Sequence, residues 1–374
     1  MKIVERLKLG KLATFLINKR LPVYNWLYFK EAFSRDLVFL LAETWGLGEG
    51  DLVLDPFVGC GTTPLACKQL GVDSVGHDVH PIMLFASRVK LRGYDVEALR
   101  AAVRVLMKSK FEKLEVEMPG FVARVFSKFL LEDIAFFKRE ILEVENEKVR
   151  EFLLLGLMNA VMRCSWAHKD GAAIRVVKKP VPPLRKALKR QLLRMCSDVE
   201  RFKGKACRVT VEHCDARKLK LADESVDAVV TSPPYLNKRE YINAYRIEQQ
   251  LLGLDAPASD QLIGVREEGA VENFSEVGEF VEEKPLEAKL YFRDMFVVLQ
   301  ELYRVCKHGA KVCLVTSDGC FPEGVVEVCE TLSKLAERTG FRAKRVIVVN
   351  KRFCTTPARK KVGIAREGLL MWER

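Results

Sequence analysis

The sequence contains no apolar run long enough to cross a membrane, although 49% of its 374 residues are hydrophobic. Lys8 and Lys11 interrupt the apolar stretch within residues 1–20, which therefore lacks the hydrophobic region of a secretory signal. None of the eleven cysteines forms a C-x-x-C pair, so no metal site is expected. These absences predict a soluble cytoplasmic protein with reduced thiols. The high Lys, Arg and Glu content is also typical of hyperthermophiles, in which intracellular disulfides occur.

A third glycine is missing from the glycine-rich turn in the first part of the chain. Residues 51–55 read as a β-strand, and the turn after it has Gly59 and Gly61 but Pro64 where a dinucleotide fingerprint needs another glycine. The sequence therefore disfavours a nicotinamide cofactor. The glycine pair still lets the backbone approach a ligand closely, and the helix that opens near Pro64 favours an anionic group at its N-terminus. A plain structural turn is the alternative interpretation.

A rigid loop follows the apolar strand predicted at residues 226–231. Ser232, Pro233, Pro234 and Tyr235 stand at the carboxyl end of that strand, where open α/β folds bind ligands. Proline fixes φ and donates no N–H, so this shelf (residues 232–235) presents carbonyl oxygens, one hydroxyl and a flat ring. It suits a planar base with an exocyclic amine, whose hydrogens would go to Ser232 Oγ and a carbonyl near Pro233.

The ordered pair DPFVGCGTT and TSPPY resembles motifs I and IV of the S-adenosylmethionine-dependent amino-methyltransferases that modify cytosine N4 or adenine N6 in nucleic acids. The resemblance implies an α/β fold with a Rossmann-like seven-stranded sheet, S-adenosylmethionine as cofactor and the shelf as catalytic site. It also implies a set of cofactor-binding residues: Asp55, Phe57, Gly59, Gly61, Thr62, Thr63, Asp78 and Asp215.

Other segments extend the resemblance over most of the predicted sheet. Residues 74–78 and 209–215 resemble the second and third strands, ending in the acidic residues that would meet the cofactor's ribose and adenine. Residues 311–316 would form the fifth strand, and residues 345–349 and 368–372 the closing antiparallel hairpin. Residues 26–34 resemble the segment over the methionine end of the cofactor. Without the motif context, Asp78 would read as a helix cap and Asp215 as a turn residue.

More than a hundred residues separate the predicted second and third strands, where a plain doubly wound domain needs one helix. The sequence therefore divides into residues 1–90, with an N-terminal helical segment and the cofactor turn, a helical insertion domain at 91–205, and the remaining methyltransferase part at 206–374. Helical periodicity recurs at 96–110, 121–140 and 149–163.

The insertion carries much positive charge. Residues 163–208 contain fourteen Lys and Arg against three Asp and Glu. Beside a site shaped for a base, this charge predicts contact with a phosphate backbone, although a solvated face and core packing of Trp166 are the alternatives. The predicted nucleic-acid contacts lie in the insertion and just after the shelf: Trp166, His168, Arg175, Lys178, Lys179, Arg185, Lys186, Asn237, Lys238 and Arg239.

An acidic stretch at residues 267–287 carries eight glutamates and one lysine. It forms part of a predicted loop insertion at about 250–290 and reads as a lid over the site mouth or as a plain solvated loop.

The base and the polymer depend on finer features. Members of the family with serine first in the shelf lean to cytosine N4, and the absence of a recognisable target-recognition domain favours structured RNA, such as archaeal ribosomal RNA, over DNA. A DNA modification methylase is the alternative. A degenerate binding protein and a protein-glutamine methyltransferase are more distant ones. The sequence does not indicate the oligomeric state.

Overall fold

The computed structural model describes residues 1–114, 120–170, 173–236, 244–265, 273–355 and 361–374. Within this part of the chain the main sheet has eight strands in the order β1-β11-β12-β8-β7-β2-β3-β6. Their bounds are β1 Lys2–Glu5, β2 Leu52–Asp55, β3 Asp73–Asp78, β6 Val209–His213, β7 Val226–Thr231, β8 Cys306–Ser317, β11 Arg342–Thr355 and β12 Lys361–Glu373. Strand β12 runs antiparallel to both β8 and β11, whereas the paired strands from β8 to β6 are parallel. The predicted Rossmann-like fold is confirmed.

Strand β1 is the difference from the predicted seven-stranded sheet. It pairs in parallel with β11, with Lys2 opposite Arg345 and Glu5 opposite Val348. The segment was expected to be helical. It is instead a short edge strand followed by 3₁₀ turns, namely η1 Leu7–Ala13, η2 Asn18–Arg20 and η3 Tyr24–Trp26.

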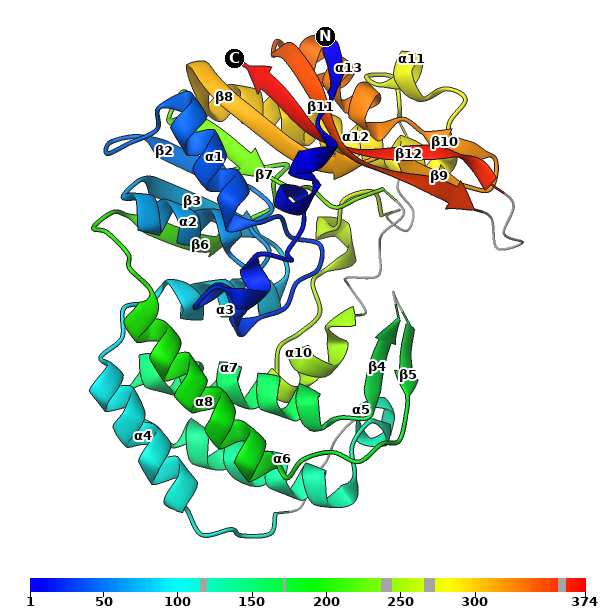
Figure 1. Cartoon of the computed structure of the whole chain (residues 1–374). Helices are drawn as coiled ribbons and strands as arrows, with labels where there is room; N and C mark the ends of the chain where they lie inside the picture. The colour runs from blue at the N-terminus through cyan, green and yellow to red at the C-terminus, as the bar shows by residue number, and fades with distance from the viewer. Residues whose placement is uncertain (115–119, 171–172, 237–243, 266–272, 356–360) are drawn as a thin grey trace.

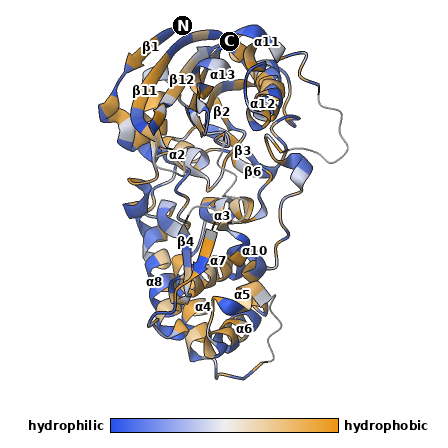
Figure 2. Cartoon of the chain, turned by 90° about the vertical axis from the view of Figure 1, so that its right-hand side faces the viewer, coloured by the Kyte–Doolittle hydropathy of each residue, from blue (hydrophilic) through white to orange (hydrophobic). Residues whose placement is uncertain are grey.

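Helices cover both faces of the sheet (Figure 1). They are α1 Arg35–Trp45, α2 Thr62–Leu70, α3 Pro81–Leu91, α12 Leu286–Val305 and α13 Val328–Thr339. Figure 2 shows hydrophobic and hydrophilic stretches on the helices, the pattern expected for helices with one buried face. Among the described helices none is long and apolar enough to cross a membrane.

A second layer of helices lies below the sheet in Figure 1, in the region predicted as an insertion. It comprises α4 Val96–Lys108, α5 Gly120–Arg124, α6 Lys128–Leu142, α7 Glu147–Cys164 and α8 Leu184–Arg201, with a small hairpin of β4 Ala167–Asp170 and β5 Ala173–Val176. Side chains at the N-caps fix where several of these helices begin. Asp95, Ser127 and Asn146 each accept a hydrogen bond from a backbone N–H in the first turn of the following helix.

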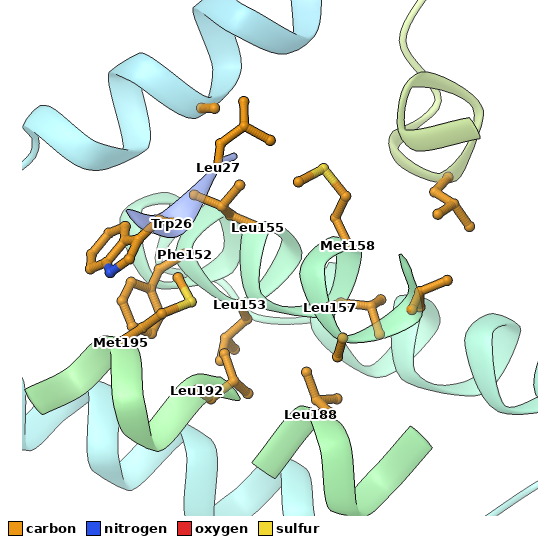
Figure 3. Close-up of a cluster of buried hydrophobic side chains, with 14 of the residues drawn as sticks. Trp26, Leu27, Phe152, Leu153, Leu155, Leu157, Met158, Leu188, Leu192 and Met195 are labelled. Carbon is orange, nitrogen blue, oxygen red and sulfur yellow. The ribbon is translucent and has the colours of Figure 1, made fainter. Parts of the chain in front are cut away.

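The insertion shares its core with the N-terminal segment (Figure 3). Trp26 is fully buried and packs edge-on against Phe152 of α7, with ring centroids 5.4 Å apart. Its indole N–H donates to Asp198 of α8 at 3.1 Å, and Asn159 Nδ2 donates to the Trp26 carbonyl at 2.6 Å. One hydrophobic cluster therefore runs from residues beside the cofactor turn into the insertion.

The remaining elements lie between β7 and β11. They are α10 Arg246–Leu252, η4 Ser259–Gln261, α11 Gly278–Val281, β9 Gly319–Phe321 and β10 Gly324–Val326. A disulfide joins Cys320 of β9 to Cys354 of β11, with the Cα atoms 5.5 Å apart. This pairing corrects the expectation that all thiols are reduced. Strand β9 belongs to a separate two-stranded sheet with β10, and its contact with β11 brings the two cysteines together although 34 residues separate them in the sequence.

Candidate active site

A pocket lies at the carboxyl ends of β2, β3 and β7, where the glycine turn and the shelf meet. Its walls come from six stretches that are distant in sequence: Phe29, Glu31, Pro56, Phe57, Gly59, Asp78, Val79, His80, Met83, Cys214, Asp215, Ala216, Ser232, Pro233, Pro234, Tyr235, Gln261, Leu262 and Ile263. The structure therefore brings all four shelf residues together with four of the predicted cofactor residues.

The other predicted cofactor residues do not line the pocket. Asp55 is 2% exposed, and its carboxylate accepts hydrogen bonds from Thr231 Oγ1 at 2.6 Å, Thr63 Oγ1 at 2.7 Å and the Phe57 N–H at 3.2 Å. Burial raises the pKa of Asp55 to about 6, although these donors act in the opposite direction. Asp55 thus ties the glycine turn on β2 to the end of β7, directly before the shelf.

The turn is also stabilised from inside the protein by Gly61, Thr62 and Thr63. Both threonines are buried, and the Thr62 hydroxyl accepts a hydrogen bond from Asn18 Nδ2 at 3.4 Å. Gly61, with φ +83°, is packed against Ser87, to which a Cβ atom would come within 3.0 Å. These residues hold the turn from behind and do not line the pocket, and their direct contact with the cofactor stays a prediction.

Gly59 is where the turn faces the pocket. Its φ is +49°, and a Cβ atom there would lie 2.7 Å from Phe29 Cε1, so only glycine fits without movement. Ser87 Oγ donates to the Gly59 carbonyl at 2.7 Å, and the ammonium group of buried Lys90 donates to the next carbonyl, that of Cys60, at 2.9 Å. Burial lowers the pKa of Lys90. The turn is thus held in the shape that a ligand would meet.

Two carboxylates stand at the pocket wall. Asp78, at the end of β3, accepts hydrogen bonds from the Gly59 N–H at 2.8 Å and the His80 N–H at 2.9 Å, and burial raises its pKa. Asp215 accepts a hydrogen bond from the Arg217 guanidinium at 2.7 Å. Each carboxylate is oriented by local donors and retains lone pairs for a ligand, so the positions suit the ribose and adenine contacts implied by the resemblance.

The hydrogen bonds of Ser232 and Tyr235 determine which groups the shelf can offer to a ligand. The Ser232 hydroxyl donates to the Val315 carbonyl of β8 at 3.0 Å, so its hydrogen is engaged and its oxygen can accept from a ligand. The Tyr235 hydroxyl lies 3.2 Å from Glu367 Oε1 of β12, and burial raises the tyrosine pKa well above its usual value. The serine therefore presents an acceptor, and the tyrosine ring is held by its far end.

Sequence reasoning did not single out several pocket residues. Phe29 and Glu31 lie in the segment expected over the cofactor's methionine end, but no individual residue was named there. Leu262 and Ile263 come from the stretch beyond α10, which carries no recognisable motif. Their apolar character beside the acidic stretch is the signal that could have identified them.

The predicted nucleic-acid residues have several environments. His168 lies in strand β4 of the β4–β5 hairpin, and Trp166 comes directly before that strand. The Trp166 indole N–H donates to the Lys179 carbonyl at 3.2 Å. The Lys178 ammonium lies 5.6 Å from the centre of the Trp166 ring. His168, Arg175, Lys178, Lys179 and Lys186 are exposed.

Arg185 has a structural role instead. Its guanidinium donates to the carbonyls of Met107 at 2.8 Å and Ser109 at 3.1 Å, at the C-terminal end of α4, and lies over the Phe137 ring. The carbonyls at a helix end attract a cation, which explains this placement. Asn237, Lys238 and Arg239 lie outside the described residues.

The described part of the acidic stretch does not line the pocket. Val281 of α11 is buried among residues that include those of α12, and Glu279 pairs with Arg338 of α13. The described residues of the stretch, from 273 onward, thus pack against the helices that cover the sheet. Among the described residues, no three His, Cys, Asp or Glu side chains gather to hold a metal ion.

Comparison with known proteins supports an amino-methyltransferase. A family model described as DNA methylase matches residues 37–84. The chain is 25% identical to the Type II methyltransferase M.BsoBI of Geobacillus stearothermophilus over 97% of this chain and 88% of that protein. It is 24% identical to M.AvaI of Nostoc sp., another Type II methyltransferase, over 91% of this chain and 83% of that protein. A solved S-adenosylmethionine-dependent methyltransferase from Methanosarcina mazei aligns with 89% of this chain and 96% of its own, at 11% identity and a TM-score of 0.33. The family model and the curated relatives agree with the N4/N6 resemblance and with S-adenosylmethionine as cofactor.

Proposed function

We propose that this chain, an S-adenosylmethionine-dependent methyltransferase of the N4/N6 amino type, methylates the exocyclic amine of cytosine in DNA. The observation that carries the proposal is the orientation of Ser232. Ser232 lines the pocket, and because its hydroxyl donates to the Val315 carbonyl, its oxygen can act as an acceptor, as an amine substrate requires. A substrate that needed a donor at this point would find none from Ser232.

The pocket residues fit the cofactor. Gly59 admits close approach of a ligand, Asp78 and Asp215 offer oriented carboxylate oxygens, and Phe29 and Phe57 supply apolar wall. S-adenosylmethionine supplies a methyl group on a positively charged sulfur. The carboxylates would accept hydrogen bonds from its hydroxyl and amine groups.

The shelf would bind and orient the target amine. One amine hydrogen would go to Ser232 Oγ and the other to the Pro233 carbonyl. Two acceptors on one nitrogen reduce the delocalisation of its lone pair into the ring and aim that lone pair across the pocket. Tyr235, fixed through Glu367, limits movement of the bound ring. A stacked duplex base cannot reach this depth, so the base would be flipped out of the helix.

We propose DNA as the substrate polymer, in place of the predicted RNA, because of the curated relatives. The predicted preference for structured RNA rested on the lack of a recognisable target-recognition domain, and it stays a prediction. Two Type II methyltransferases align over 97% and 91% of this chain, so their alignment extends across the helical insertion. With the DNA methylase model, this favours DNA. The choice of cytosine N4 as the methylated position rests on Ser232 as the first residue of the shelf.

The test is methyl transfer from radiolabelled S-adenosylmethionine to DNA and RNA from a strain lacking the gene, followed by nuclease digestion and mass spectrometry of the nucleosides. We expect N4-methylcytosine in DNA. The variant Ser232→Ala should reduce single-turnover transfer at least about tenfold, or roughly 1.4 kcal/mol of barrier. Ser225→Ala, at the opposite end of β7, is the matched control and should transfer like the wild type.

The other outcomes separate the alternatives. Label in RNA restores the RNA prediction, and methylated adenine shows that the serine position does not select the base. Label in protein alone, or full activity of the Ser232→Ala variant, contradicts the proposed function.

A further inference from the structure

The hairpin formed by β11 and β12 carries a second concentration of positive charge. Residues 342–366 contain nine Lys and Arg and no Asp or Glu. The net charge of +12 for the whole chain conceals this cluster, because the acidic stretch at 267–287 offsets it. Four of these cations pair with carboxylates of neighbouring elements: Arg342 and Lys344 with Glu373, Lys351 with Glu5, and Arg366 with Asp318. Arg352 and Lys361 are exposed toward the far end of the hairpin, where their charge suits a polyanionic partner.

The far end of this hairpin also exposes apolar surface. Phe353 of β11 and Ile364 of β12 are cross-strand partners, and they are 59% and 51% exposed. The Lys361 ammonium lies 4.2 Å from the centre of the Phe353 ring, and Arg352 beside it is exposed. An aromatic face flanked by cations suits a nucleotide strand, since bases or sugars can pack on the ring while phosphates meet the charges.

The base of the hairpin adjoins the shelf. A polar cavity is lined by Tyr235, Ser317, Asn350, Lys351, Arg352, Ala365 and Glu367. Tyr235 also lines the active-site pocket, so this residue is common to the two cavities. An irregularity in the strand register between Val348 and Asn350 re-aims the side chains that follow. Figure 1 shows the end of this hairpin and the β4–β5 hairpin of the insertion on the same side of the molecule.

We propose that the β11–β12 hairpin is a second nucleic-acid arm, which binds the phosphodiester backbone of the substrate strand beside the flipped base. Arg352 and Lys361 contact phosphates, and Phe353 packs against a base or sugar. The basic surface of the insertion holds the polymer from the other side of the site. This inference rests on the proposed function and adds the surface that carries the flanking nucleotides.

The test uses the variant Arg352→Glu/Lys361→Glu in the full chain. Binding to a random-sequence DNA duplex and to its separated strand is measured by fluorescence anisotropy over a range of salt concentrations. Loss of two phosphate contacts should flatten the log–log salt dependence by about 1.8. The control Lys148→Glu/Lys334→Glu makes the same charge change at exposed sites on α7 and α13, and it should match the wild type. Phe353→Ala should weaken binding of the separated strand more than binding of the duplex.

Cofactor binding, measured in parallel, should be unchanged in all these variants. If the glutamate variant melts at a lower temperature, Arg352→Gln/Lys361→Gln removes the same contacts without introducing repulsion and should give the same slope. A wild-type slope in either hairpin variant, with wild-type methylation intact, would overturn the arm and leave the proposed function standing. Wild-type protein that neither binds nor methylates nucleic acid defeats both.

Discussion

Replacement of Asp55 by asparagine should change how stability depends on pH. The carboxyl group is 2% exposed, and burial raises its pKa from 3.8 to about 6. Because the folded pKa lies above the unfolded one, the folded protein holds this proton more tightly. The stabilisation is complete below pH 3.8 and is lost as the pH rises through 6. At 1.36 kcal/mol for each unit of pKa, the change amounts to ~3 kcal/mol.

Asparagine has nearly the same shape and no titration in this range. It can still accept from Thr63 or Thr231, and its amide hydrogens add an offset that does not vary with pH. The unfolding free energy of the variant relative to the wild type should therefore increase by about 2–3 kcal/mol between pH 4 and 7. Asp78, whose pKa is also raised, is common to both proteins and cancels.

The assay is urea unfolding of ligand-free protein at a series of pH values. Asp255→Asn, at an exposed aspartate, is the control and should give a difference from wild type that changes much less with pH. A stability difference between the Asp55→Asn variant and wild type that stays constant from pH 4 to 7 would refute the reasoning. It would mean that the three hydrogen bonds to Asp55 compensate its burial.

Three further changes probe the cofactor wall, the shelf and the disulfide. Asp78→Ala should weaken S-adenosylmethionine binding at least about tenfold in a calorimetric titration, or roughly 1.4 kcal/mol. Unchanged affinity would show that this carboxylate does not contact the cofactor. Tyr235→Phe keeps the ring but not the contact with Glu367, so its single-turnover rate should fall less than that of Tyr235→Ala. Equal losses of rate in the two variants would show that the hydroxyl, and not the ring, is required. Cys354→Ser opens the loop that the disulfide with Cys320 closes, and it should lower the free energy of unfolding by about 2–4 kcal/mol. Reductant should lower the stability of the wild type to the same value, and no effect of reductant would show that the disulfide does not form.

The features predicted well are those encoded in short contiguous segments. The glycine turn and the shelf each depend on backbone properties of glycine and proline, so their residue types specify local geometry directly. Alternation and length of the apolar runs then predicted the strands and most helices of the insertion. Because parallel strands share a carboxyl edge, the convergence of the two motifs followed from their order along the chain.

The errors arise where contacts join distant segments. The sequence does not reveal that Thr231 binds Asp55 across 176 positions, or that Arg185 binds backbone carbonyls at the end of α4. Charge counting could not distinguish that partly buried guanidinium from an exposed one such as Arg175. The pairing of β1 with β11 and of Cys320 with Cys354 likewise depends on tertiary packing.

The continuity of the hydrophobic core from Trp26 into α7 and α8 has a consequence for how the protein selects its target. An accessory domain on a linker could close over many substrates and adjust its distance to each. Here the helices that carry the basic surface share buried side chains with the segment beside the cofactor turn, so sliding them would break the Trp26 hydrogen bonds to Asp198 and Asn159. The distance between the basic surface and Ser232 is therefore fixed by the packing of the core. Under the proposed function, a nucleic acid that spans both would have to bend or unpair to match this distance, so its deformability would contribute to recognition.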